Sequence, residues 1–161
     1  MKRLIAVTAP LVILGGAVLP RAYASAHANV SAQRQQQARI DTTITVRAEG
    51  PILEFLPGRL AAKNGLRVRL RFINDGLLPH NVVVPKDYDD LDELSNASMQ
   101  SGSTGYIPLG LKEKMLAYTK LASPGDTVDV VFVMPAAGEY TFVCLYPGHT
   151  NNMTGTLRSL R

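Results

Sequence analysis

The feature that most constrains the fold is a stretch in which apolar and charged residues alternate one for one. The apolar positions are Leu66, Val68, Leu70 and Phe72, and arginine occupies each of the three positions between them. Successive side chains of a strand point to opposite faces, so this period of two predicts a strand with one buried face.

Similar short segments follow along the chain, separated by Gly, Pro, Asn and Asp. We predict strands around residues 44–46 and at 80–84, 127–133, 139–144 and 154–157. Short strands at such spacing are typical of two sheets packed face to face, so the predicted fold is an all-β sandwich. Residues 87–99 and 111–118 instead carry apolar residues at helical spacings, which predicts a partly helical insertion between residues 87 and 118 with a loop at 102–110.

The first 26 residues have the pattern of a secretory signal. Lys2 and Arg3 precede an apolar stretch that ends at Leu19, and Ala24 and Ala26 offer small-residue cleavage sites. We predict an exported protein, periplasmic or otherwise extracytoplasmic, that meets a membrane only if the signal segment is retained. Residues 27–39 are polar and Gln-rich and predict a flexible leader, which leaves residues 40–161 as one domain.

The charge balance excludes nucleic acid as an expected partner. The chain has 17 basic and 13 acidic residues, but the basic Lys2, Arg3 and Arg21 lie in the predicted signal. The remainder is nearly neutral, whereas binding to phosphates requires a strongly basic surface.

Cys144 is the only cysteine of the chain. An exported protein meets an oxidising compartment, where an exposed free thiol is a liability. Since an internal disulfide is impossible, the thiol must be buried, paired between chains or bound to a metal.

Cys144 also opens a ten-residue segment, C-L-Y-P-G-H-T-N-N-M, that contains His149 and Met153. Soft sulfur ligands combined with imidazole select copper over magnesium, calcium or manganese, and two histidines, one cysteine and a weak axial methionine form a blue-copper site. The second histidine has one good candidate, His80, which begins an apolar segment. We therefore predict one Cu(I)/Cu(II) ion held by His80, Cys144, His149 and Met153.

Together with the segment P-H-N-V-V-V, this motif resembles the azurin-type cupredoxins, the blue type 1 copper proteins that include azurins and auracyanins. The resemblance covers much of residues 66–157 and implies an eight-stranded Greek-key sandwich. It assigns equatorial ligation to His80, Cys144 and His149 and axial ligation to Met153. It also implies that backbone N–H groups at Asn81 and Tyr146 point at the sulfur, and that the Asn81 side chain joins the two ligand loops.

Two features depart from the azurin pattern. Azurins usually have a glycine before the first histidine, where this chain has Pro79, and a disulfide near the N-terminus, for which this chain lacks a second cysteine. The backbone carbonyl of Pro79 is nevertheless a candidate for a weak axial contact with copper.

A closed site with four protein ligands leaves no open position for a substrate, so the sequence favours a one-electron carrier over an enzyme. The expected partners are larger redox proteins that dock transiently, such as a cytochrome c or a terminal reductase or oxidase. One alternative is a copper chaperone or storage module, which would need an exchangeable site. Another is a subunit of a copper-dependent reductase, which would need further histidines. His27 is the one remaining histidine and a candidate ligand if signal cleavage leaves it near the new N-terminus.

Overall fold

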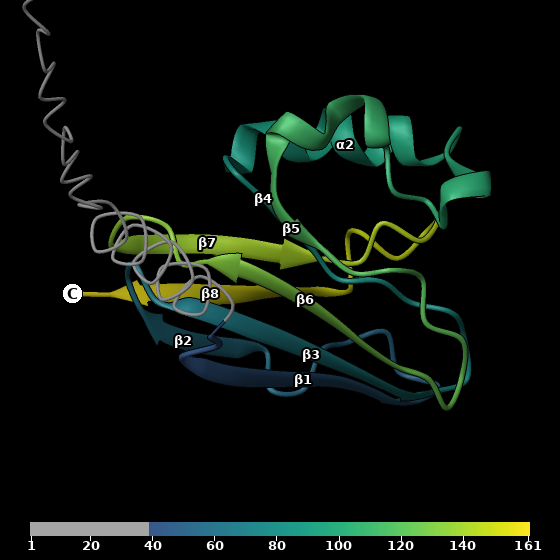
Figure 1. Cartoon of the computed structure of the whole chain (residues 1–161). Helices are drawn as coiled ribbons and strands as arrows, with labels where there is room; N and C mark the ends of the chain where they lie inside the picture. The colour runs from purple at the N-terminus through teal and green to yellow at the C-terminus, as the bar shows by residue number, and fades with distance from the viewer. Residues whose placement is uncertain (1–38) are drawn as a thin grey trace, which may run out of the picture. The chain divides into compact units, whose positions relative to one another are not determined.

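The computed structural model describes residues 39–161, which form two β-sheets with a short helical segment beside them (Figure 1). The predicted signal peptide, His27 and all of the predicted leader except Arg39 lie outside the described residues. No helix within residues 39–161 is long and apolar enough to cross a membrane. The all-β prediction with about eight strands is confirmed, since the described residues contain eight strands and a single short α-helix.

The smaller sheet has three strands in the order β1-β3-β6. They span Thr42–Gly50, Arg67–Gly76 and Thr127–Val133; β1 runs parallel to β3, and β6 runs antiparallel to it. The alternating stretch is a strand as predicted, with Val68, Leu70 and Phe72 buried in the core, while Leu66 directly precedes β3 and is half-buried. The arginines of the stretch lie on the other face, where Arg71 donates hydrogen bonds to Asp129 of β6.

The larger sheet has five strands in the order β2-β8-β7-β4-β5, spanning Arg59–Lys63, Thr154–Leu160, Gly138–Val143, Val83–Pro85 and Met115–Tyr118. β2 pairs with β8 in parallel, and the other neighbours are antiparallel. We did not predict β2 from the sequence. Its residues R-L-A-A-K bury Leu60 and Ala62 in alternation, but two of the five are alanines, which favour strands little. The predicted strand at 80–84 is wrong in its bounds, because β4 begins only at Val83.

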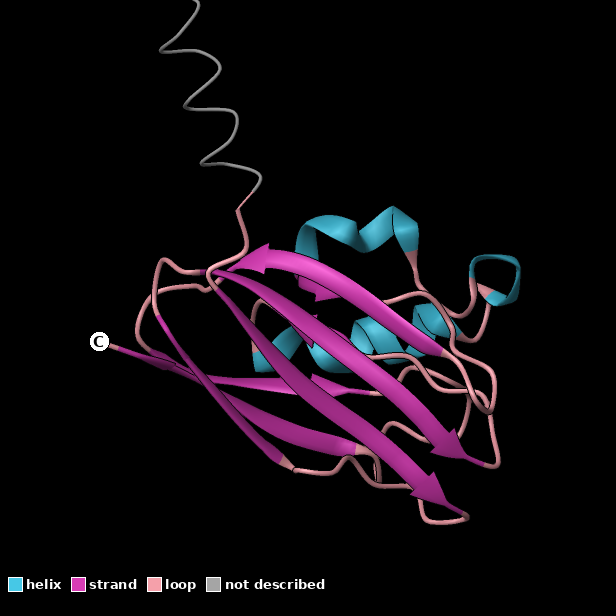
Figure 2. Ribbon diagram, turned by 60° about the horizontal axis from the view of Figure 1, so that its bottom comes forward, coloured by secondary structure: helices cyan, strands magenta, loops and turns pink. Residues whose placement is uncertain are grey.

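The partly helical insertion lies between β4 and β5 along the chain, and its helical segments are cyan in Figure 2. It consists of a 3₁₀ turn at Tyr88–Asp90, helix α2 at Leu91–Ser98, and further 3₁₀ segments at Gly102–Thr104 and Leu109–Lys114. Leu94 of α2 packs with a small second group of buried residues, Val83, Ile107, Met115, Val143 and Leu145. Because the first 3₁₀ turn and α2 together span residues 88–98, the helical prediction for residues 87–99 is confirmed.

The helical prediction for residues 111–118 is wrong in its second half. Met115–Tyr118 is strand β5, which pairs with β4. Met115 and Ala117 are buried while Leu116 and Tyr118 are half-buried, which is the alternation of a strand. The three-residue spacing of Met115 and Tyr118 fitted a helix equally well, and four residues are too few to separate the two periods.

The main core fills the space between the sheets and includes four phenylalanines, Phe55, Phe72, Phe132 and Phe142. Phe142 of β7 packs against Phe55, with ring centroids 5.1 Å apart. On its other side it lies directly over Gly155 of β8, its cross-strand partner. A side chain at position 155 would overlap the Phe142 ring.

We predict that Gly155→Ala destabilises the protein by about 1 to 3 kcal/mol, the usual cost of overpacking a filled core. Gly110→Ala is the matched control, because a Cβ there would meet nothing within 4 Å. Urea unfolding of the copper-free proteins measures the difference. Equal midpoints for the two variants would show that the ring moves aside without cost.

Candidate metal centre

Three chain segments bring the predicted ligands together at one end of the sandwich, the end toward which β7 points in Figure 1. Cys144 directly follows β7, and residues 145–153 form the loop that leads into β8. His80 lies between β3 and β4 and forms an isolated bridge with Ala122, which lies between β5 and β6. The site therefore depends on contacts between segments far apart in sequence.

The donor atoms of His80, Cys144 and His149 form a compact triangle. The two Nδ1 atoms are 3.1 Å apart, and the Cys144 Sγ lies 3.8 Å from Nδ1 of His80 and 3.7 Å from Nδ1 of His149. The exposed fractions of Cys144, His80 and His149 are 0%, 1% and 5%. Among the described residues, no other group of three or more His, Cys, Asp or Glu side chains is close enough to hold a metal ion.

The size and chemistry of this triangle fit a copper ion. A point in its plane equidistant from the three donors lies about 2.1 Å from each, against metal distances of roughly 2.0 to 2.3 Å to histidine nitrogen and cysteine sulfur in proteins. One thiol with two imidazoles is the equatorial set of blue-copper sites. The donors are thus already spaced for a first-row transition metal.

The loop after Cys144 folds back so that Met153 lies beside both Cys144 and His149. The Met153 N–H donates to the carbonyl of His149 (2.8 Å), and the Met153 carbonyl accepts from the N–H of Cys144 (3.0 Å). Gly148 supports the turn with a φ of +81°, a conformation that residues with a side chain rarely adopt. Met153 is fully buried in the core that also contains Cys144.

Burial acts on the thiol in the direction opposite to its effect on the histidines. It raises the pKa of Cys144 to about 11, and backbone hydrogen bonds from Asn81 and Tyr146 to the sulfur partly oppose this rise. These two N–H groups are the ones that the resemblance implied. The pKa of His80 falls to about 4 through burial and the charge of His149, and burial also lowers the pKa of His149. Both imidazoles are therefore neutral at pH 7, the form that binds metals.

The Asn81 side chain joins the two ligand segments. Its Oδ1 accepts from the N–H of Leu145 (2.8 Å), next to Cys144, and its Nδ2 donates to the carbonyl of Gly105 (3.0 Å). The side chain is fully buried. Its position directly after His80 therefore fixes the distance between the His80 segment and the end of β7.

Two further hydrogen bonds at the site were not predicted from the sequence. Thr150 donates to the carbonyl of Cys144 (3.1 Å) and accepts from the Ser95 hydroxyl of α2 (3.3 Å), which connects the insertion to the cysteine. Ser and Thr are so common on helix surfaces and in loops that no local pattern marks this pair.

Aromatic rings cover one side of His149. The Tyr146 ring lies tilted against the imidazole, with centroids 4.8 Å apart, and meets Tyr106 edge-on at 5.0 Å. Tyr106, which the sequence did not indicate, has a φ of +64°. Pro79 is half-buried directly before His80, and contact of its carbonyl with copper stays a prediction.

A β-sandwich with a buried His₂Cys triangle at one end defines the cupredoxin class, and comparison with known proteins agrees. Residues 42–158 match the family described as copper binding proteins, plastocyanin/azurin family. The chain therefore belongs to the plastocyanin/azurin family, as the resemblance indicated. Members of this class carry single electrons on a blue copper centre, which confirms the prediction of a copper cofactor and of one-electron carriage.

Within the family, the chain is similar to the auracyanins. It is 33% identical to auracyanin-A of Chloroflexus aurantiacus over 118 residues, covering 71% of this chain and 72% of that protein. It is also 33% identical to auracyanin-B of the same organism over 119 residues, covering 71% of this chain and about half, 51%, of the relative. The solved structure of auracyanin A, described as a blue copper protein, matches with a TM-score of 0.69 at 32% identity and covers 73% of this chain and 97% of the other.

We predict that the copper-free protein loses stability as the pH falls from about 6.5 to about 4. An unfolded histidine titrates near 6.5, whereas His80 in the folded protein has a pKa of about 4, so the unfolded chain binds more protons in this window. The free energy of unfolding should decrease by up to about 3 kcal/mol, at about 1.4 kcal/mol per pKa unit.

Urea titrations at a series of pH values measure this dependence. His80→Gln removes the titrating group and should flatten the decline, leaving the smaller contribution of His149. A decline as steep in His80→Gln as in the wild type would contradict the assignment.

Proposed function

We propose that His80, Cys144 and His149 bind one copper ion in a trigonal plane, with Met153 as the weak axial ligand, and that the protein carries electrons between redox proteins outside the cytoplasm. The observation that supports this ligand set is the convergence of three buried donor atoms within 4.8 Å of one another. The proposed export signal at residues 1–26 would deliver the protein to the periplasm.

Bound copper supplies the redox chemistry by alternating between Cu(I) and Cu(II). The two oxidation states usually prefer different coordination shapes, so a site that holds its donors still reduces the rearrangement that accompanies each electron. Backbone hydrogen bonds restrain each donor here: His80 pairs with Ala122, Cys144 with Met153, and His149 with the loop around it. The β-scaffold also keeps water and exchangeable ligands away from the donors.

We propose that electrons enter and leave through His149, the most exposed of the three donors. Leu77 and Leu78 precede His80 and are 67% and 44% exposed, and we propose that they form an apolar docking surface together with Pro79 and Pro147. A small apolar surface suits transient encounters with a cytochrome c or with a terminal reductase or oxidase.

The geometry opposes the two alternative functions. A copper chaperone or store releases its metal and therefore needs accessible donors, whereas these donors are at most 5% exposed. A catalytic metal centre keeps an open coordination position, which the proposed four-ligand set does not leave. We therefore propose that the protein is not an enzyme.

Cys144→Ser should abolish the intense visible charge-transfer band of the copper-loaded protein, because the band arises from the thiolate bound to Cu(II). The absorption spectrum after copper addition measures this loss. Met99→Leu, which also removes a sulfur atom but at a 57% exposed position, should leave the band unchanged. A band that persists in Cys144→Ser would overturn the ligand assignment.

Electron exchange with a cytochrome separates a carrier from a copper store. The reduced, copper-loaded protein should reduce an oxidised cytochrome c rapidly and should keep its copper in the presence of a mild chelator, because the donors are buried and restrained. Stopped-flow absorbance follows the cytochrome, and loss of the blue band follows the copper. If the chelator removes copper faster than electrons are exchanged, the protein is a store.

A further inference from the structure

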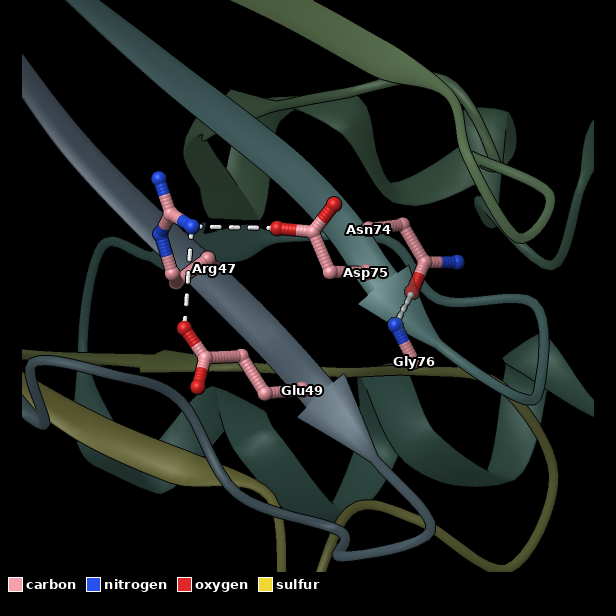
Figure 3. Close-up of polar contacts among 5 residues, drawn as sticks. All are labelled: Arg47, Glu49, Asn74, Asp75 and Gly76. Atoms are coloured by element: carbon pink, nitrogen blue, oxygen red, sulfur yellow. Dashed lines mark hydrogen bonds and ion pairs between the residues drawn. The ribbon is translucent and has the colours of Figure 1, made fainter.

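Asn74 is a fully buried polar residue near the end of β3 and lies outside the ligand set. Its side-chain Nδ2 donates to the carbonyl of Leu78 (2.9 Å) and to the carbonyl of Ala122 (2.9 Å). Its Oδ1 accepts from the N–H of Gly76 (3.1 Å), a bond that Figure 3 shows. The amide group thus has three partners, all of them backbone groups.

Two of these partners belong to backbone segments that restrain His80. Leu78 lies two residues before it, and Ala122 exchanges a pair of hydrogen bonds with it, N–H to carbonyl in both directions at 3.0 and 2.8 Å. The NH₂ group of Asn74 therefore joins the segment that carries His80 to the segment that pairs with it. The backbone of Asn74 adds bonds to Gly125 (2.7 Å) and Asp126 (2.9 Å), which anchor the turn after Ala122.

The third partner, Gly76, lies against the imidazole itself. A Cβ placed on Gly76 would be 3.4 Å from Nε2 of His80, 3.1 Å from Oδ1 of Asn74 and 3.3 Å from the carbonyl of Gly50. Oδ1 of the Asn74 side chain accepts the hydrogen bond from the Gly76 N–H. This bond therefore also restrains the backbone that lies beside Nε2 of the His80 ring.

From these contacts we propose that Asn74 is a positioning residue of the metal centre: it fixes His80 through both flanking backbone segments and thereby sets the copper affinity and the reduction potential. The proposal rests on the ligand set of the proposed function. Without the amide, the part-buried carbonyl of Leu78 and the buried carbonyl of Ala122 lose their side-chain donor, and the His80 segment can shift relative to Cys144 and His149.

The test compares Asn74→Ala with Asn74→Ser in copper-loaded protein. Copper affinity is measured by competition with a chelator, the charge-transfer band by absorption, and the potential by redox titration. Loss of the amide should weaken copper binding by about 10-fold to 100-fold, the usual effect of removing a group that orients a metal ligand, and should displace both the band and the potential. Serine keeps one donor and should cause a smaller displacement of the same sign.

Two control variants separate positioning from general stability. Ser159→Ala removes a part-buried hydrogen bond to the carbonyl of Pro135 (2.8 Å) at the end of β8 remote from the site, so it should lower the urea midpoint but leave the band and the potential unchanged. Asp75→Asn changes the neighbour of Asn74 on the opposite face of β3, where Asp75 pairs with the half-exposed Arg47 (Figure 3). This variant should resemble the wild type in all three measurements.

A wild-type band, affinity and potential in Asn74→Ala would overturn the proposal, and so would equal shifts in Ser159→Ala. If Asn74→Ala does not fold, Asn74→Ser decides by the same criteria. Failure of the proposed function looks different: the wild-type protein itself would lack the band, or Cys144→Ser would retain it.

Discussion

The structure depends on holding three polar donor atoms close together in a space that excludes water. Nδ1 of His80 and Nδ1 of His149 are 3.1 Å apart, and the thiol of Cys144 lies less than 4 Å from both. Burying polar groups that lack hydrogen-bond partners is unfavourable. Without restraint from the backbone, the three donors would therefore tend to move apart or to admit water. The sandwich prevents this through backbone hydrogen bonds, which anchor His80 to Ala122 and both Cys144 and His149 to Met153.

Two buried asparagines do much of this anchoring, and they act on different sides of His80. Asn74 joins the segment before His80 to Ala122, whereas Asn81 joins the segment after it to Leu145 and Gly105. An asparagine amide can donate and accept at once, so one short side chain can bind backbone groups from two or three segments. His80 is thus held on both sides, although it belongs to no strand.

The sequence could predict the ligand set, because three of the ligands are local and His80 was the one good candidate for the second histidine. Cys144, His149 and Met153 lie within ten residues, so this combination of thiol, imidazole and thioether pointed to copper, and the alternation around Val68 and Leu70 indicated a strand. The role of Asn74 was invisible, because an Asn followed by Asp and Gly is ordinary turn sequence and its partner Ala122 is 48 residues away. Strands β2 and β5 were missed for a related reason: each is short, and pairing with a distant neighbour determines its conformation.

Burial affects the two kinds of ligand in opposite ways, and this explains why the site needs hydrogen-bond donors around the sulfur. A buried imidazole loses its proton more readily, which leaves a neutral nitrogen available to a metal. A buried thiol keeps its proton more strongly, which opposes the thiolate that copper requires. The N–H groups of Asn81 and Tyr146 lie where they stabilise negative charge on the sulfur, and both belong to backbone next to or near a proposed ligand. The backbone segments that position the histidines therefore also favour ionisation of the cysteine thiol. A change in the geometry of the centre consequently changes its electrostatics as well.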